Sequence, residues 1–256
     1  MQSLPLIEIF ITSIRLAAKK SKLFFKFGSP FVLIGLILFL FINASIFESD
    51  ANIFIDIAIF ILEIGIFATA VMAIVGCHRV FLLNETEVLE TKVLRLGGRE
   101  LRFIGWWIVI GLCVSIVVIP MLLLAVPLVL DFIDNTFSDK DVAGNIIVPL
   151  MGLPVYYLVA RWSLLLPATA IDQRPNLGWA WSLSKGNSMR LTLLVGIVPL
   201  VSAILMNFLS ETDSIIYKGL VEMVWLVVMV VEIGLLSLSY QWLVGTERGE
   251  SESRVS

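Results

Sequence analysis

The chain has 256 residues, of which 59% are hydrophobic and only 15% are charged, and its mean hydropathy is +0.98. A soluble domain is roughly half apolar and one quarter charged, so the composition excludes a soluble globular protein and indicates a chain that lies in a bilayer. The formal net charge of −3 gives no reason to expect a nucleic-acid partner.

Residues 1–26 predict an amphipathic helix that lies at the membrane interface. Arg15, Lys19, Lys22 and Lys26 follow one another at helical spacing, which places them on one face, and apolar side chains occupy the opposite face. Cations in such a position bind the headgroups of anionic lipids. We expect this segment to anchor the chain in the headgroup plane.

Six apolar runs follow that can cross about 30 Å of hydrocarbon, which takes roughly 20 helical residues. They are 31–47, 53–75, 104–130, 146–171, 191–209 and 220–243. The first run is short, which leaves open whether it crosses fully, and the third and fourth carry prolines that predict kinks. The sequence therefore predicts an all-α polytopic membrane protein with six transmembrane helices, short cytoplasmic interfacial helices and a polar tail at 245–256.

The distribution of lysine and arginine predicts the orientation of these spans. With the N-terminus in the cytoplasm, the inner segments hold fifteen of these cations and the outer loops hold only Lys140 and Lys218. Cytoplasmic loops of membrane proteins carry such an excess of positive charge. We therefore expect a multi-pass protein of the plasma (inner) membrane with both termini cytoplasmic.

Apart from Glu222, which lies near the outer end of the sixth span where water can reach it, four charged residues lie within the predicted spans: Asp56 and Glu63 in the second, Arg161 in the fourth and Glu232 in the sixth. An isolated charge there costs at least a few kcal/mol, so each must be neutralised, paired or hydrated. Arg161 can pair with Glu63 or Glu232 as a structural clamp, or snorkel to the cytoplasmic headgroups. Alternatively, the four line a path for a proton, a cation or a lipid headgroup. The clamp is favoured, because transport paths usually show more polar residues per span.

Enzyme chemistry has little support in the sequence. The only histidine, His78, is expected at the inner membrane interface beside Arg79, and no second ligand cluster accompanies it. No hydrolase, phosphate-loop or dinucleotide-binding motif occurs. We expect no catalytic residues, no metal and no other cofactor.

Segment 156–196 carries two short motifs, an Arg-small-Leu-apolar-Pro element and, after an acidic turn, a Trp-Ser-Leu-Ser-Lys-Gly-Asn element. The matching residues are Arg161, Ser163, Leu164, Pro167, Asp172, Trp181, Leu183, Ser184, Lys185, Gly186 and Asn187. On these residues the chain resembles the membrane domain found alongside bacterial glycerophosphodiester phosphodiesterases, and related uncharacterised six-helix membrane proteins. The resemblance implies a bacterial integral membrane module without implying an activity.

The second motif, with Lys185 and Arg190 beside Trp179 and Trp181, predicts another cytoplasmic lipid-facing segment. Together with the basic N-terminal helix, this segment predicts that the chain binds the anionic lipid headgroups of the bilayer. A second membrane protein is the other partner that the sequence leaves open. The sequence favours a non-enzymatic module that organises lipid or partner proteins. The alternative is a transporter of a small solute, ion or lipid that uses Glu63, Glu232 and Arg161.

Overall fold

A computed structural model of the protein describes residues 2–45, 53–136, 152–210 and 215–255, and no strand occurs in these ranges. The helices are α1 (Leu6–Lys19), α2 (Ser21–Ser45), α3 (Ile53–Leu82), α4 (Glu85–Leu89), α5 (Gly98–Thr136), α7 (Leu153–Trp162), α8 (Leu165–Ala170), α9 (Leu177–Leu183), α10 (Ser188–Thr192), the π-helix η1 (Leu193–Ile197), α11 (Val198–Ser210) and α12 (Ile215–Val255). The described part is therefore all-helical.

Five stretches in the described ranges are long and apolar enough to cross a membrane. They are Ser21–Ile42, Ile53–Leu82, Gly98–Met121, Ser188–Leu209 and Gly219–Glu247. Five of the six predicted spans overlap these stretches. The architecture is thus compatible with a multi-pass membrane protein.

The predicted fourth span, 146–171, is not among the five. Its first six residues lie outside the described ranges, and the rest forms two helices, of which the ten-residue α7 is only about 15 Å long. The break arises because Pro167 has no N–H to donate to the carbonyl of Ser163, which accepts from Leu166 N–H instead at 2.9 Å. The interruption lies at one of the prolines that predict a kink, and the described residues do not confirm a sixth full span.

The N-terminal region also differs from the prediction of one helix over 1–26. Helix α1 ends at Lys19 and α2 begins at Ser21, so Lys22 and Lys26 belong to the first spanning helix. Lys20 turns the chain, and its Nζ donates to the carbonyl oxygen of Val80 at 2.7 Å. The spacing of apolar residues does not reveal this change of direction, because the sequences of α1 and α2 both have a helical pattern.

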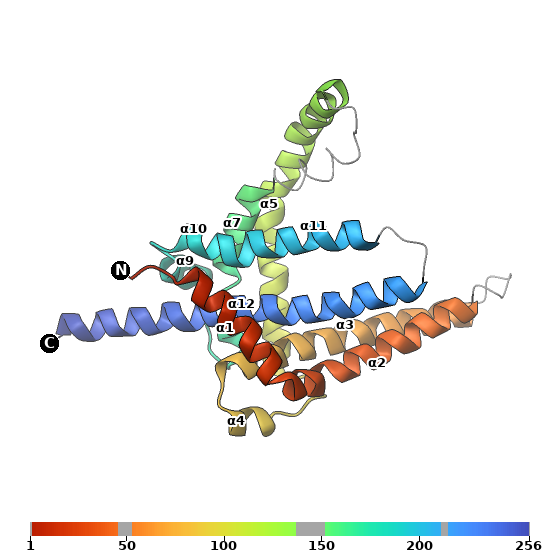
Figure 1. Cartoon of the computed structure of the whole chain (residues 1–256), viewed down its shortest axis with the longest axis horizontal. Coiled ribbons are helices and arrows are strands. Elements are labelled where there is room, and N and C mark those ends of the chain that lie inside the picture. Colours follow the sequence, from red (N-terminus) through yellow and green to blue (C-terminus); the bar gives the residue numbers. More distant parts are fainter. Residues whose placement is uncertain (1, 46–52, 137–151, 211–214, 256) are drawn as a thin grey trace.

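Four long helices, α2, α3, α11 and α12, run side by side, and α5 with α7 crosses them at a steep angle (Figure 1). Helix α2 packs along α3, α12 packs against both α3 and α11, and α1 lies across α12. Helices α2 and α3 approach closely at Gly76, where an added Cβ would lie 2.5 Å from the ring of Phe27. The first described residues and the end of α12 lie at the same end of the molecule (Figure 1).

That end, which we call the base, holds most of the core. Short helix α8 packs there against α3, α5 and α12, while α9 packs against α7 and α12, and α10 packs against α7. The most buried large side chains of this core include Phe103, Leu164, Leu165, Leu191 and Leu235. The opposite halves of the spanning helices expose apolar side chains, such as Phe54 and Leu123, as expected of surfaces that face lipid.

Candidate functional site

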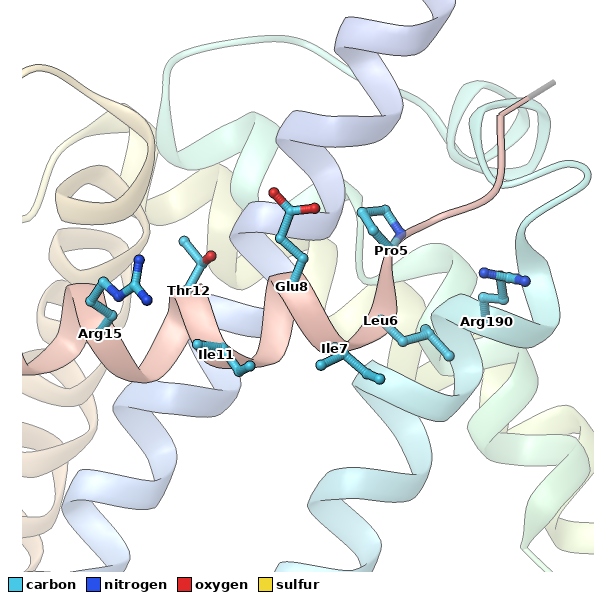
Figure 2. Close-up of a pocket in the computed structure, with 8 residues that line it drawn as sticks. All are labelled: Pro5, Leu6, Ile7, Glu8, Ile11, Thr12, Arg15 and Arg190. Carbon is cyan, nitrogen blue, oxygen red and sulfur yellow. The ribbon is translucent and has the colours of Figure 1, made fainter.

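A pocket of about 730 Å³ lies beside α1, and we call it the α1 groove. Its lining residues come from α1, the segment before it and α10: Pro5, Leu6, Ile7, Glu8, Ile11, Thr12, Arg15 and Arg190. Figure 2 shows Ile7 and Ile11 along one edge of α1, and Glu8, Thr12 and Arg15 along the other. The groove therefore combines an apolar edge with a polar one.

Hydrogen bonds to the α10 region fix the start of α1. The side chain of Asn187 accepts from Leu4 N–H at 2.8 Å and donates to the carbonyl of Gln2 at 3.1 Å. Arg190 Nη1 donates to the carbonyl of Leu4 at 2.9 Å. Asn187 and Leu4 are buried, so these hydrogen bonds are shielded from water. They fix the position of the backbone at the start of α1, where the groove begins.

The buried face of α1 is fixed against α12. Ile9 and Ser13 are buried, and the Ser13 hydroxyl donates to the carbonyl of Val231 at 2.7 Å. The opposite face leaves Ile7 76% and Ile11 49% exposed, next to the exposed Arg15. Apolar and cationic groups side by side on one interfacial helix are suited to an amphiphile with a negative headgroup.

Arg161 is only 4% exposed and lies at the end of α7. Its guanidinium donates to Ser184 Oγ at 2.8 Å, to the Tyr157 hydroxyl at 3.0 Å and to the carbonyl of Trp181. The guanidinium carbon also lies 3.3 Å from the centroid of the Trp181 ring. These groups come from α7 and from the second motif, so Arg161 does hold two segments together, although through neutral oxygens and an aromatic ring.

The predicted ion pair of Arg161 with Glu63 or Glu232 is not found in the described structure. Glu63 and Asp56 are exposed on α3, and Glu232 is half-buried on α12, where its carboxylate accepts from the Ser202 hydroxyl. Neither of the two pockets described is lined by any of these four residues. The structure therefore does not bring them together as one path, because α3, α7 and α12 present them in different directions.

The predicted lipid-facing cations lie mainly on the surface of the base. Their exposed members are Arg15, Lys19, Lys22, Lys185 and Arg190. Lys26 is half-buried, and its Nζ lies 3.4 Å from the carbonyl oxygen of Leu89 in α4. Burial also lowers the pKa of Lys20, an effect that the nearby Glu85 carboxylate opposes.

A second pocket, of about 460 Å³, lies at the base between the end of α3, α4 and the start of α5. Its lining residues are Arg79, Leu83, Glu87, Glu90, Thr91, Lys92, Arg95, Arg99, Ile171 and Asp172. Three guanidiniums, those of Arg79, Arg99 and Arg102, lie 3.2–3.4 Å from the carboxylate oxygens of Asp172. We call these four residues the arginine cluster.

Sequence reasoning did not find the arginine cluster. Asp172 stands in the acidic turn that follows the first motif, and in the sequence the three arginines are part of the general excess of positive charge in the predicted inner segments. Asp172 has a φ of 65°, which a non-glycine residue rarely adopts, and that backbone turn directs its carboxylate to the arginines. No periodic pattern signals such a turn, since it depends on the loop after α8.

The side chain of His78 is buried, with 1% of its surface exposed. Its Nδ1 lies 2.8 Å from Ser237 Oγ, and that hydroxyl donates to the carbonyl of Ile233 at 2.7 Å. Ser237 therefore accepts from His78, which fixes the proton on Nδ1. Within the described ranges, no group of three or more His, Cys, Asp or Glu side chains is arranged to hold a metal ion.

The chain matches no protein-family model, no curated protein and no solved structure.

Proposed function

We propose that this protein is a non-enzymatic membrane module that organises lipid, and that an anionic phospholipid of the inner leaflet binds in the α1 groove. The observation that supports this most directly is the composition of the groove wall. Arg15 and Arg190 line it together with the exposed Ile7 and Ile11, and these two cations outnumber the one carboxylate of the wall, that of Glu8. A phospholipid has a matching order of groups, with a phosphate above an acyl chain.

The position of the groove supports the same ligand. In the proposed topology the base faces the cytoplasm and both termini lie there, in the inner membrane of a bacterial cell. The leaflet on that side carries the anionic lipids, and each basic residue near its surface contributes about 1 kcal/mol to binding. The exposed Lys19, Lys22 and Lys185 add to this attraction without lining the groove.

Transport along Asp56, Glu63, Arg161 and Glu232 is a weaker proposal. The guanidinium of Arg161 is surrounded by Ser184, Tyr157 and Trp181, and the carboxylates of Asp56 and Glu63 lie on the outer surface of α3. A conducting path needs polar groups that line one continuous cavity. The separation of these side chains therefore argues for the lipid-organising role.

The test is native mass spectrometry of the detergent-solubilised protein with phosphatidylglycerol and with phosphatidylcholine. We expect the wild type to retain phosphatidylglycerol preferentially, and Arg15→Gln to weaken that binding about fivefold, as loss of about 1 kcal/mol requires. Ile7→Ser should weaken both lipids, because it removes apolar contact area.

Lys185→Gln is the matched control, since it removes one exposed cation outside the groove. If Arg15→Gln and Lys185→Gln weakened phosphatidylglycerol binding equally, the lipid would be attracted by the general surface charge. That result would overturn the α1 groove as the binding site. A wild type that retains both lipids equally would overturn the proposed preference for anionic headgroups.

A further inference from the structure

We propose that the 460 Å³ pocket at the base is a binding site for a phosphate group, and that Asp172 occupies it in the structure as an internal substitute for that ligand. The proposal starts from the arginine cluster, where one carboxylate faces the guanidiniums of Arg79, Arg99 and Arg102. It concerns a different pocket from the α1 groove.

The distances indicate that Asp172 satisfies these arginines incompletely. Its contacts with Arg79, Arg99 and Arg102 are 3.4, 3.2 and 3.4 Å, whereas charge-assisted hydrogen bonds between nitrogen and oxygen are usually about 2.7–2.9 Å. Arg99 reaches 2.8 Å with its other partner, the buried Glu100. A phosphate group carries more negative charge than a carboxylate and offers a third oxygen, so each of the three guanidiniums can face its own acceptor.

Two of the arginines are held in place in advance. The side chains of Arg79 and Arg99 are only 13% and 16% exposed. Arg79 also donates to Thr91 Oγ1 and to the carbonyl of Ala170, both at 3.1 Å. Guanidiniums that are fixed and partly shielded from water bind phosphate oxygens with little further loss of side-chain entropy.

The balance of charge around the pocket also favours an anion once Asp172 moves away. Four cations line the pocket, and two of them, Lys92 and Arg95, form no salt bridge with another described residue. Without Asp172, only Glu87 and Glu90 oppose them among the lining residues. Both glutamates are exposed, so water screens their repulsion.

Asp172 can leave the cluster at small cost. Its side chain is 55% exposed, and it belongs to the loop between α8 and α9. Asp and Asn are among the few non-glycine residues that tolerate positive φ, so the backbone can keep its turn while the carboxylate rotates into water. A phosphate group then replaces the carboxylate at the same guanidiniums.

The variants Asp172→Asn and Arg102→Gln test this exchange, because their expected effects have opposite signs. Asparagine tolerates the same backbone conformation and removes the competing charge, so we expect phosphate affinity to rise at least tenfold. Arg102 is 40% exposed, and within the described residues its guanidinium forms a hydrogen bond and a salt bridge with Asp172 alone. Arg102→Gln should therefore stay folded and bind phosphate several-fold more weakly.

The measurement is calorimetric titration of the full-length protein in non-ionic detergent at constant ionic strength. One arm uses inorganic phosphate and the other uses mixed micelles that contain phosphatidic acid. Tighter binding in Asp172→Asn with inorganic phosphate supports a site for a soluble phosphate compound, and tighter binding with phosphatidic acid alone supports a lipid headgroup.

Arg15→Gln serves as the control here, since it changes the α1 groove and leaves this pocket intact. The phosphate affinity of this variant should equal that of the wild type. The control therefore distinguishes failure of the proposed phosphate site from failure of the proposed lipid site in the α1 groove. Unchanged or weaker binding of both ligands by a folded Asp172→Asn variant would overturn the proposal, because Asp172 would then be a structural partner of the arginines alone.

Discussion

At the scale of single residues, the informative side chain is Arg161. A guanidinium inside an apolar segment needs compensation, and the sequence offers only carboxylates as obvious partners. The structure supplies three neutral oxygens and the face of Trp181 instead. Hydrogen bonds from a charged donor contribute more than neutral ones, and the fork of the guanidinium allows all of them at once.

We therefore predict that Arg161→Gln and Arg161→Lys both destabilise the protein, by about 2–4 kcal/mol. Lysine keeps the positive charge, but its single ammonium group cannot reach Ser184, Tyr157 and Trp181 together. Arg161→Lys should therefore recover little of the stability that is lost in Arg161→Gln. Thermal unfolding in detergent gives the comparison. Full rescue by lysine would mean that charge alone stabilises this position, contrary to the geometry.

Asn187 illustrates recognition of a backbone by one side chain. It is buried and bonds to both Leu4 N–H and the carbonyl of Gln2, so its replacement leaves two backbone groups without their partner. We predict that Asn187→Ala releases the N-terminal segment and costs about 1–3 kcal/mol. Hydrogen exchange should show faster exchange at Leu4 and along α1, and unchanged protection there would contradict this role.

At the scale of elements, helix pairs are set by close backbone approach. Helix α2 packs along α3, and Gly76 lies directly against the ring of Phe27. Gly65 lies on the same helix, and an added Cβ there would meet Ile34 at 3.7 Å, an ordinary contact. The two glycines thus face the same neighbouring helix with different clearance.

We predict that Gly76→Ala destabilises the α2–α3 pair by about 1–3 kcal/mol, because Phe27 must leave its rotamer or the helices must separate. Gly65→Ala should be neutral or stabilise by up to about 1 kcal/mol, through its better helix propensity. Denaturation of both variants in the same detergent tests the difference. A similar loss of stability in both would mean that helix packing here is insensitive to clearance.

At the scale of the whole molecule, the core and the charges gather at one end. The base contains the short helices, the arginine cluster and the α1 groove, whereas the far halves of the spanning helices expose apolar surface. Both ends of the described chain also lie at the base (Figure 1). The sequence predicts that the chain returns to its starting side through six crossings, an even number, and the described residues contain five stretches that are long and apolar enough to cross.

We therefore predict that reporters fused to the N-terminus and to the C-terminus both lie in the cytoplasm. Fluorescent-protein fusions, active there, and alkaline phosphatase fusions, inactive there, provide the measurement. An alkaline phosphatase inserted after residue 140, in the predicted outer loop, should be active. Termini on opposite sides would contradict the even count and favour five crossings.

The sequence by itself determined that this is an all-helical chain of membrane-protein type. Hydropathy and the length of apolar runs are local properties of the chain, and they decide whether a helix is stable in a bilayer. The sequence also located Arg161, and the cations that line the α1 groove, on composition and spacing alone. Only the tertiary structure decided their partners. The convergence of α3, α5 and the turn at Asp172 and the burial of Arg161 by Trp181 depend on segments that are distant in the chain. Helical periodicity does not specify which of these segments come into contact.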